Sequence, residues 1–404
     1  MDIIFLTMSN VQKISEDGIY NDLMRCFRDK GHNVTIVTPR EPRLGKQKTM
    51  LKKEDGVQIL GVRTLNLQKA SIIEKGIGQL LVEYQFKRAI KRHLGNVKMD
   101  LILYTTPPIT LMGVVKSLKK RNPQAKSYLL LKDIFPQNAV DIGIMRKEGV
   151  KGILYKFFRN KEKLLYRLSD YIGCMSPANV RYVLKENPEI PPERVEVAPN
   201  SYEIQEMVKL TDEQRVAIRQ KYNLPIGCPI LVYGGNLGKP QGIPFLIQCL
   251  EANANRQDCH FLVVGNGTEY GKLESWYNER KPNCVSVFQR LPKEDYDQLV
   301  RACDVGLIFL DYRFTIPNYP SRLLPYLMEK KPIIAATDPN CDTGSIAEQN
   351  GYGLWCPSND VQAFTRCVNK MLQSDLAQMG ENGYQFYLEN YTVDHTYNAI
   401  MKHF

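Results

Sequence analysis

The feature that most constrains the fold is an alternation of short apolar runs with helix-length amphipathic stretches, which occurs twice along the chain. Beta-branched and aliphatic runs of this length, separated by helical patterns, are typical of a parallel sheet covered by helices on both faces. The predicted strands of the first half are 2–7, 33–38, 57–63, 99–104, 127–131, 170–175 and 194–198. Those of the second are 229–234, 259–265, 284–288, 304–309, 332–336 and 352–356. The pattern predicts an α/β protein with two separate sheets.

A boundary lies where the pattern restarts, after the segment Pro199-Asn200-Ser201. A chain of 404 residues is too long for one hydrophobic core, so two domains are expected. We predict domains at 1–205 and 206–384, a linker around 200–212, and a last helix, 385–404, that packs back on the first domain. Open α/β sheets bind ligands at the carboxyl ends of their strands. The functional residues should therefore lie in strand-to-helix loops.

Charge is distributed unevenly between the two halves. Residues 1–200 hold 35 Lys and Arg against 20 Asp and Glu, a net +15, whereas the remainder holds 19 against 23, a net −4. This asymmetry indicates that the first half faces a polyanion, either phospholipid headgroups or nucleic acid. The ten cysteines are scattered without a C-x-x-C pair, which favours reduced thiols. Without a signal-peptide pattern or an apolar run near 18 residues, the expected location is cytoplasmic.

The strongest local motif is YGGNLGKPQG, residues 233–242, in which a predicted strand ends in a glycine-rich loop. Glycines allow the backbone to approach a phosphate, a helix expected to start near Gln241 offers free N–H groups, and Lys239 adds a positive charge. The loop is therefore interpreted as a diphosphate cradle. The alternative is that its glycines serve only tight packing, since the pattern is neither a P-loop nor GxGxxG.

Three further segments follow strands on the same side of the second sheet. Two are short loops, Gly265-Asn266-Gly267 and Gln289-Arg290-Leu291-Pro292. In the third, residues 316–335, Pro320 and Ser321 are expected to open a helix beside Arg322, whose guanidinium suits a pyrophosphate. The alternative for the third segment is an ordinary capped helix with a solvated arginine. Convergence of these loops at one sheet edge favours a nucleotide site.

In the first half, two strand ends carry polar groups. The loop in YTTPPITLMG, residues 104–113, follows one predicted strand, and LLLKDIFPQNAVDIG, residues 129–143, brings Lys132 and Asp133 to a loop after another. A carboxylate at such a strand end suits proton transfer from a substrate hydroxyl. The alternative for Asp133 is a helix cap.

The ordered set of motifs resembles glycosyltransferase family 4. It comprises GGN-x-G-K-x-x-G, G-x-G, the R-L-P loop, D-V-G-L and P-S-R-L-L-x-Y-x-x-x-x-K-P, and DIFPQNAVD is similar to a signature of bacterial O-antigen and capsule enzymes. The resemblance covers nearly the whole chain and implies a retaining transferase of the GT-B fold, with two Rossmann-like domains. One departure is that Pro317 and Pro325 stand where many members carry two glutamates, the second of which contacts ribose. Glu329 falls on a small-residue position of the family.

The resemblance also implies roles for individual residues. Lys239 and Arg322 would neutralise the donor phosphates, and Asp133 would act on the acceptor hydroxyl, although many relatives carry His at Lys132, which leaves the base open. Other donor-binding residues would be Gly18, Gly235, Asn236, Gly265, Gly267, Arg290, Leu291, Pro320 and Ser321. The acceptor-binding residues would be Thr106, Pro107, Lys132, Asp133 and Asn138.

The expected reaction is front-face transfer in which the leaving diphosphate helps to deprotonate the acceptor. No DxD-like motif stands at a strand end, so no metal and no cofactor is expected. Two segments, 72–95 and 150–169, are predicted to be basic helices, and the second interleaves apolar and basic residues, a pattern that fits peripheral docking on an anionic membrane. The alternative for each is a core-facing helix with a solvated basic face.

These observations predict a glycosyltransferase that moves a sugar, by resemblance an N-acetylated hexose, from a UDP-sugar to a polyprenyl-diphosphate-linked saccharide at the inner face of the cell membrane. Two alternatives stay open at this stage. A nucleotide-sugar 2-epimerase would use the same fold without a basic acceptor domain. A nucleic-acid-binding protein would use the basic half directly, but aromatic single-strand platforms and recognition motifs are missing, so nucleic acid is not an expected partner.

Overall fold

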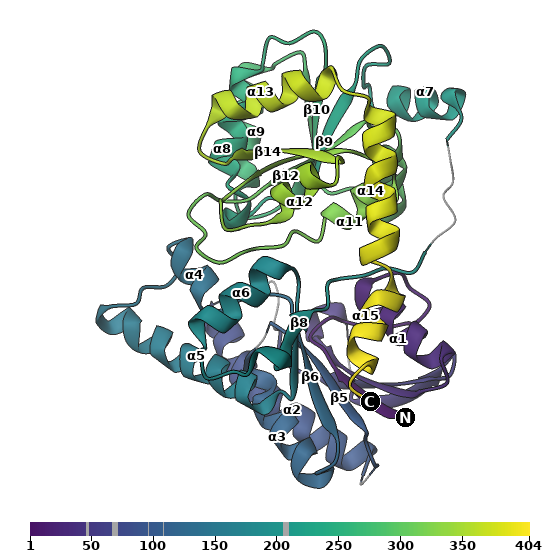
Figure 1. The fold of residues 1–404 in the computed structure, drawn as a ribbon, viewed down its shortest axis with the longest axis vertical. Coiled ribbons are helices and arrows are strands. Elements are labelled where there is room, and N and C mark those ends of the chain that lie inside the picture. Colours follow the sequence, from purple (N-terminus) through teal and green to yellow (C-terminus); the bar gives the residue numbers. More distant parts are fainter. Residues whose placement is uncertain (46–47, 67–71, 96, 108, 205–209) are drawn as a thin grey trace. The chain divides into compact units, whose positions relative to one another are not determined.

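The computed structural model describes residues 1–404 except 46–47, 67–71, 96, 108 and 205–209. The chain divides into two compact units (Figure 1). Unit 1 comprises Met1–Glu203 together with Thr392–Phe404, and unit 2 comprises Ile204–Tyr391. Each is an α/β unit built on a mainly parallel sheet, so the predicted fold class is confirmed.

The sheet of unit 1 has eight strands in the order β3-β4-β2-β1-β5-β6-β7-β8. Every neighbouring pair is parallel except β3 and β4. The strands are β1 (Asp2–Leu6), β2 (Asn33–Arg40), β3 (Met50–Glu54), β4 (Val57–Arg63), β5 (Leu101–Thr106), β6 (Lys126–Leu131), β7 (Tyr171–Cys174) and β8 (Val195–Val197). All but β3 were predicted, within a few residues at each end.

Helices cover both faces of this sheet. The helix α1 and the C-terminal helix α15 pack together over one face, where Phe5, Phe27 and Ile400 share a core, while α2, α3 and α5 lie on the other face (Figure 1). The helices are α1 (Ile19–Asp29), α2 (Ile72–His93), α3 (Met112–Arg121), α4 (Gln137–Asp141), α5 (Gly149–Leu168), α6 (Pro177–Glu186) and α15 (Val393–Met401), with short 3-10 turns at Pro42–Leu44, Ile109–Leu111 and Pro192–Arg194.

The sheet of unit 2 has six strands, all parallel, in the order β11-β10-β9-β12-β13-β14. Both faces are buried, which explains why these strands are continuous apolar runs in the sequence. They are β9 (Ile230–Asn236), β10 (His260–Asn266), β11 (Val285–Phe288), β12 (Val305–Phe309), β13 (Ile333–Thr337) and β14 (Gly353–Pro357).

The helices of unit 2 again lie on both faces. Side chains of α8, α9 and α13 fill the core on one face, and α11 packs on the other face with α14 beside it. The helices are α7 (Asp212–Lys221), α8 (Ile243–Ala252), α9 (Tyr270–Arg280), α10 (Lys293–Arg301), α11 (Leu323–Met328), α12 (Thr343–Gln349), α13 (Val361–Leu372) and α14 (Leu376–Asn390), with a 3-10 turn at Lys239–Gln241.

The boundary differs in detail from the prediction. Unit 1 ends at Glu203, and residues 205–209 of the predicted linker lie outside the described residues. The segment that returns to unit 1 begins at Thr392, where 385 was expected. The physical reason is that α14 belongs to unit 2, because the absence of a side chain at Gly380 lets it approach the backbone of Lys330, and Gly383 packs against Tyr352.

Candidate functional site

Two glycine-containing loops lie side by side at the carboxyl end of the unit 2 sheet. In the parallel register of β9 and β10, Gly235 is opposite Gly265 and Asn236 is opposite Asn266. A methyl group at Gly265 would lie 2.0 Å from the carbonyl oxygen of Gly235, and one at Gly267 would lie 2.4 Å from that of Leu237. Gly265 and Gly267 are therefore needed for the close approach of the two loops.

Gly235 is different from its neighbours. Its φ of 122° lies in the region that favours glycine, and it is exposed. The nearest atom to a methyl group built there would be Nη2 of Arg322, at 3.5 Å. The backbone of Gly235 is thus open beside a cation, which is the environment that the phosphate-loop interpretation requires.

Arg322 is held against this loop by an aromatic ring. Its guanidinium carbon lies 4.3 Å from the ring centroid of Tyr233, the residue that precedes the two glycines. Its Nη1 atom is buried and has no hydrogen-bond partner among the described residues. An unpaired buried nitrogen on a charged group is costly, so the arrangement favours an incoming anion.

Lys239 and Asn236 lie on the exposed side of the same loop. Lys239 begins the 3-10 turn Lys239–Gln241, and no hydrogen bond or ion pair to a described residue holds its ammonium group. The side-chain amide of Asn236 donates to Oε1 of Gln241 at 3.0 Å. The same oxygen accepts a hydrogen bond from the backbone amide of Gly238 at 3.2 Å. The helix expected near Gln241 starts slightly later, at Ile243, because Gly242 adopts a left-handed conformation (φ 59°).

The segment around Pro320 and Ser321 forms a turn that precedes α11. The amide of Leu323 donates to the Pro320 carbonyl at 3.1 Å, so the helix begins at Leu323, later than expected. Ser321 is exposed, and Arg322 occupies the N-cap position. Of the four residues expected to form one diphosphate site, the structure brings Gly235 and Arg322 together, while Lys239 and Ser321 are exposed on neighbouring loops.

The predicted nucleoside loop follows β11. Arg290 is exposed and Leu291 is half-buried. Within the described part of the chain, no hydrogen bond or ion pair joins Arg290 to the loops after β9 and β10. The Glu329 carboxylate accepts a hydrogen bond from Nε of Arg301 at 2.8 Å. This contact agrees with the expectation that Glu329 does not replace the family glutamates, whose positions are held here by Pro317 and Pro325.

In unit 1, Asp133 lies just beyond the carboxyl end of β6. The side-chain amide of Asn138 donates to both of its carboxylate oxygens, at 2.8 and 2.9 Å, and the hydroxyl of Thr106 donates to its carbonyl oxygen at 3.4 Å. Burial raises the pKa of Asp133 to about 6, against the lowering effect of the Asn138 hydrogen bonds. Pro136 occupies the N-cap of α4, so the helix-cap alternative for Asp133 does not describe this carboxylate.

Lys132 points to a different partner. Its ammonium donates to the carbonyl oxygen of Ala198 at 3.1 Å, and its amide donates to the Thr106 hydroxyl at 3.2 Å. Burial lowers the pKa of Lys132 to about 7. Four of the five predicted acceptor residues, Thr106, Lys132, Asp133 and Asn138, thus form one connected group, while Pro107 is exposed on the loop after β5.

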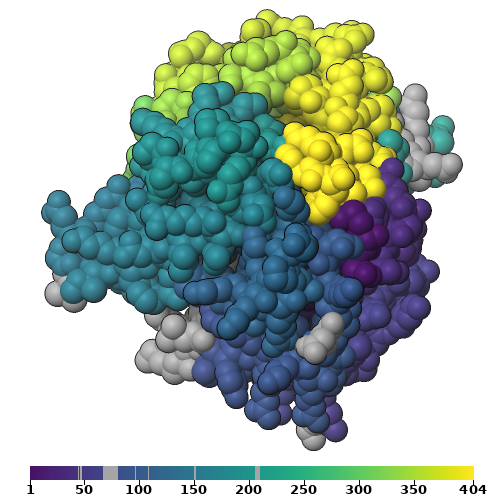
Figure 2. Space-filling view, turned by 60° about the horizontal axis from the view of Figure 1, so that its bottom comes forward, coloured from purple at the N-terminus to yellow at the C-terminus, as the bar shows by residue number. Residues whose placement is uncertain are grey.

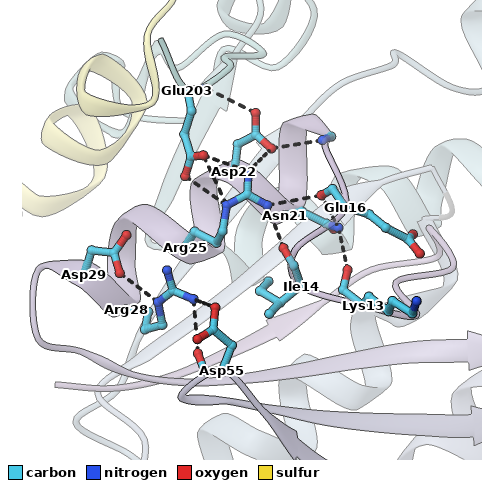
Figure 3. A network of polar contacts seen from close by, with 11 residues as sticks. Lys13, Ile14, Glu16, Asn21, Asp22, Arg25, Arg28, Asp29, Asp55 and Glu203 are labelled. Atoms are coloured by element: carbon cyan, nitrogen blue, oxygen red, sulfur yellow. Dashed lines mark hydrogen bonds and ion pairs between the residues drawn. The ribbon is translucent and has the colours of Figure 1, made fainter. Parts of the chain in front are cut away.

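Gly18 is the N-cap residue of α1, and its amide donates to Oδ1 of Asp22 at 2.9 Å. A methyl group there would meet nothing within 4 Å. Asp22 is fully buried and belongs to a polar network in which Arg25 joins the carbonyl of Ile14 to the carboxylate of Glu203 (Figure 3). The loop before α1 is therefore fixed to the end of unit 1 by charged hydrogen bonds.

Sequence reasoning missed three tyrosines around Arg322. They are Tyr233 on β9, Tyr296 on α10 and Tyr326 on α11. Tyr233 and Tyr326 stand inside the motifs that were singled out, but a tyrosine in an apolar run is indistinguishable from an ordinary core residue. Tyr296 follows the R-L-P loop in an amphipathic helix, and no pattern marks it.

The described residues contain no group of three or more His, Cys, Asp or Glu side chains placed to hold a metal ion. All ten cysteines are free thiols, as expected. None of the helices in the described part of the chain is both long and apolar enough to cross a membrane.

Two family models match the chain. Residues 20–206 match "Glycosyltransferase Family 4", and residues 214–386 match "Glycosyl transferases group 1". Among relatives in sequence, "Probable glycosyltransferase WbjE" of Pseudomonas aeruginosa is 24% identical over 314 residues, which are 77% of this chain and 75% of that protein. WcaI of Escherichia coli (strain K12), provisionally described as a colanic acid biosynthesis glycosyl transferase, is 23% identical over 76% of this chain and 75% of its own length.

Solved structures agree with the fold. Alr3699/HepE of Anabaena, whose crystal structure contains UDP, superposes with a TM-score of 0.70 at 16% identity, over all of this chain and 99% of that one. Sucrose-phosphate synthase of Thermosynechococcus elongatus gives a TM-score of 0.76 at 15% identity, over 100% and 98% of the two chains. Taken with the motifs and the two sheets, these matches show that the chain belongs to glycosyltransferase family 4 and is a glycosyltransferase of the GT-B fold.

Proposed function

We propose that this glycosyltransferase is a retaining enzyme that moves a sugar from a UDP-sugar to a polyprenyl-diphosphate-linked saccharide in surface polysaccharide synthesis. The sugar we propose is an N-acetylated hexose. The observation that carries the proposal is the buried Nη1 of Arg322, which has no hydrogen-bond partner in the part of the chain that the structure describes, beside the open backbone of Gly235. Support for UDP comes from Alr3699/HepE, which was crystallised with UDP and with UDP-glucose, and support for the pathway comes from the description of WcaI.

The donor diphosphate would lie between the Gly235 backbone and the guanidinium of Arg322. Lys239 and the backbone of Ser321 would contact the phosphates from the exposed side, with Asn236 and Pro320 bordering them. Gly265, Gly267, Arg290 and Leu291 would border the nucleoside. Phosphate oxygens accept well from guanidinium and backbone N–H donors. The Arg322 nitrogen that lacks a partner would then gain one.

The chemical step proposed is front-face substitution at the anomeric carbon. The bond from that carbon to the β-phosphate oxygen breaks with its electron pair on UDP, and a bond to the acceptor oxygen forms on the same face. Arg322 and Lys239 stabilise the charge that develops on the β-phosphate. Removal of one such donor typically costs about 3 kcal/mol of transition-state stabilisation.

The proton of the acceptor hydroxyl passes to an oxygen of the leaving diphosphate, while the Asp133 carboxylate accepts a hydrogen bond from that hydroxyl and orients it for attack. With a pKa of about 6 this carboxyl is mostly ionised near neutral pH and can therefore act as the hydrogen-bond acceptor. Thr106 and Asn138 hold its loop and its carboxylate, and Lys132 and Pro107 would line the acceptor side. The reaction is proposed to need no metal ion, because cationic side chains occupy the place at which the charge develops.

The membrane contact is proposed for the outer face of α5. Ile153 is 70% exposed and Phe157 45% exposed, with Leu154 and Leu164 also exposed. Basic side chains accompany them, since Lys156 is exposed and Nζ of Lys161 lies 5.0 Å from the Phe157 ring centroid. Figure 2 shows the segment that contains α5 standing out at left. The outer face therefore carries apolar side chains, which the solvated-helix alternative does not require.

Anionic lipids attract each nearby basic residue by about 1 kcal/mol, and insertion of exposed apolar side chains adds to this. Sedimentation with phosphatidylglycerol vesicles tests the contact. Exchange of Ile153 and Phe157 for Ser should reduce the vesicle-bound fraction, whereas Ile226→Ser, which changes an exposed apolar residue of unit 2, should not. Equal binding of all three proteins would remove α5 from the proposal.

Incubation of the protein with UDP-N-acetylhexosamines and a polyprenyl-diphosphate-linked saccharide in vesicles tests the function. We expect a longer lipid-linked saccharide whose new linkage has the anomeric configuration of the donor. Free epimerised nucleotide sugar without any acceptor product would identify the 2-epimerase instead. An inverted linkage would contradict the retaining assignment.

A further inference from the structure

Arg322 is charged, largely enclosed and not neutralised by an acid. No ion pair to a carboxylate of the described residues is formed by its guanidinium, and Nη1 is buried without a partner. Such a group would ordinarily be paired, because an isolated buried charge costs several kcal/mol. The environment of Arg322 must therefore stabilise the cation in another way.

Three tyrosines form part of that environment. The Tyr233 ring lies under the guanidinium, with its centroid 4.3 Å from the guanidinium carbon. The Tyr326 hydroxyl donates to the Val232 carbonyl at 3.0 Å and accepts the Gly234 amide at 3.2 Å, so this side chain is tied to the backbone of β9 on both sides of Tyr233.

The third tyrosine completes the arrangement from α10. A methyl group at Gly234 would lie 1.7 Å from the Tyr296 hydroxyl oxygen, so this side chain rests directly against the phosphate loop. Gly306 likewise leaves space for Tyr326, because a methyl group at Gly306 would lie 2.4 Å from the Tyr326 ring. Glycines at 234 and 306 thus make room for tyrosines, which explains both positions without a ligand contact.

The chemical consequence concerns charge. Burial raises the pKa of Tyr296 to about 12 and the pKa of Tyr233 and Tyr326 above the ordinary value, so all three phenols are neutral at physiological pH. The face of an aromatic ring attracts a cation without cancelling its charge, by about 2 kcal/mol or more when the pair is desolvated. A carboxylate would hold the arginine equally well but would compete with a phosphate for it.

Resting on the proposed function, we propose that Tyr233, Tyr296 and Tyr326 are positioning residues that hold Arg322 as an uncompensated cation for the donor diphosphate. Tyr233 contacts the arginine, and Tyr296 and Tyr326 contact Gly234 of the phosphate loop. The arginine in turn would contact the ligand. The site is thereby specific for a dianionic group at Gly235, and it should distinguish a nucleoside diphosphate from a nucleoside by charge.

Titration calorimetry of the full chain with UDP and with uridine tests the proposal. Tyr233→Leu removes the aromatic face, and the loss of a desolvated cation–π contact should raise the Kd for UDP about tenfold or more while the Kd for uridine changes less than about threefold. Tyr233→Phe keeps the face and should bind UDP within about threefold of the wild-type chain. In transfer assays Tyr233→Leu should lower kcat as well as raise KM.

Two further variants complete the test, one at a second tyrosine of the group and one as a control for a general loss of stability. Tyr296→Leu changes a half-buried residue and should also weaken UDP selectively. The matched control is Tyr352→Leu, which removes a fully buried tyrosine of unit 2 whose ring packs on Phe386, at a centroid distance of 5.2 Å, and it should leave the ratio of the two Kd values unchanged.

The outcomes separate the two proposals. A wild-type chain that binds UDP no more tightly than uridine overturns the proposed function and the tyrosine proposal with it. A wild-type preference for UDP that survives in both leucine variants at 233 and 296 overturns the tyrosine proposal alone. The same result follows if Tyr352→Leu loses the preference as strongly as they do.

Discussion

At the scale of single residues, Arg322 and Asp133 are proposed to carry the chemistry, and they illustrate how far the sequence predicts a site. Both were identified from their positions at strand ends and in motifs. The unpaired Nη1 of Arg322 among the described residues and the raised pKa of Asp133 were not predictable, because both depend on how the fold buries these side chains. The tyrosines that surround Arg322 come from β9, α10 and α11, and only the fold brings them together.

Replacement of Asp133 by Asn should separate stability from activity. Because burial raises the folded pKa to about 6 from 3.8, the ionised form is unfavourable in the folded state, and the wild-type chain loses stability as pH rises from about 4 to about 6. Asp133→Asn should therefore be more stable by roughly 1 to 3 kcal/mol near pH 8, with the difference vanishing below about pH 4. Chemical denaturation at several pH values measures it.

The same variant should keep donor binding and lose transfer, and wild-type transfer should fall as pH decreases through about 6 because the carboxyl becomes protonated. Full transfer activity in Asp133→Asn would remove this residue from the mechanism. A difference in stability that grows as pH falls would contradict the assigned pKa direction.

Lys239 offers a second test, because its side chain is exposed and forms no bond within the described part of the chain. Lys239→Ala should leave the melting temperature of the ligand-free protein nearly unchanged, within about 1 °C. It should abolish the selective stabilisation by one nucleoside diphosphate in a thermal-shift panel of UDP, GDP and ADP. A large loss of ligand-free stability would instead assign Lys239 a structural role.

At the scale of elements, the buried parallel strands were predictable because each is a continuous apolar run. The strand β3 was missed since its sequence, MLKKE, contains two lysines and is largely exposed, as befits an edge strand. A signal was nevertheless present. Asp55 and Gly56, which connect β3 to β4, both have positive φ, and Asp-Gly is a strong hairpin signal.

Gly265, which is in close contact with another loop, and Gly18, which has open space around it, should respond differently to replacement by alanine. Gly265→Ala places a methyl group 2.0 Å from the Gly235 carbonyl oxygen, so the loops of β9 and β10 must separate, at a cost of at least about 2 kcal/mol of unfolding free energy. Gly18→Ala meets no atom within 4 Å and has an extended backbone, with φ of 162°, so its stability should change by less than about 1 kcal/mol. Urea denaturation of both variants compares them, and equal losses would refute the packing role of Gly265.

For the whole molecule, the division into two α/β units follows from the restart of the apolar pattern. The residue at which the second unit ends could not be predicted from the sequence. Only Tyr391 and Thr392 separate α14 from α15, and no sequence pattern indicates which sheet each helix covers. The charge asymmetry belongs to this scale as well, since the basic half coincides with unit 1 and with the exposed face of α5.

The absence of a metal requirement is a prediction for the intact enzyme. Cationic side chains are proposed to stabilise the leaving diphosphate, so transfer activity in the presence of excess EDTA should stay within about twofold of the untreated rate. Abolition of activity by EDTA with recovery on addition of Mg²⁺ or Mn²⁺ would show that a divalent cation, and not Arg322 with Lys239, carries the diphosphate charge.

The central claim is that the loops of unit 2 hold a nucleoside diphosphate through Arg322 at Gly235. The most direct measurement is the affinity of the full chain for UDP relative to uridine, in the wild type and in Arg322→Met, a variant that keeps an unbranched side chain without the charge. We predict that the wild type prefers UDP by at least about a hundredfold and that Arg322→Met loses most of that preference while binding uridine unchanged. An Arg322→Met variant with the wild-type preference would contradict the account.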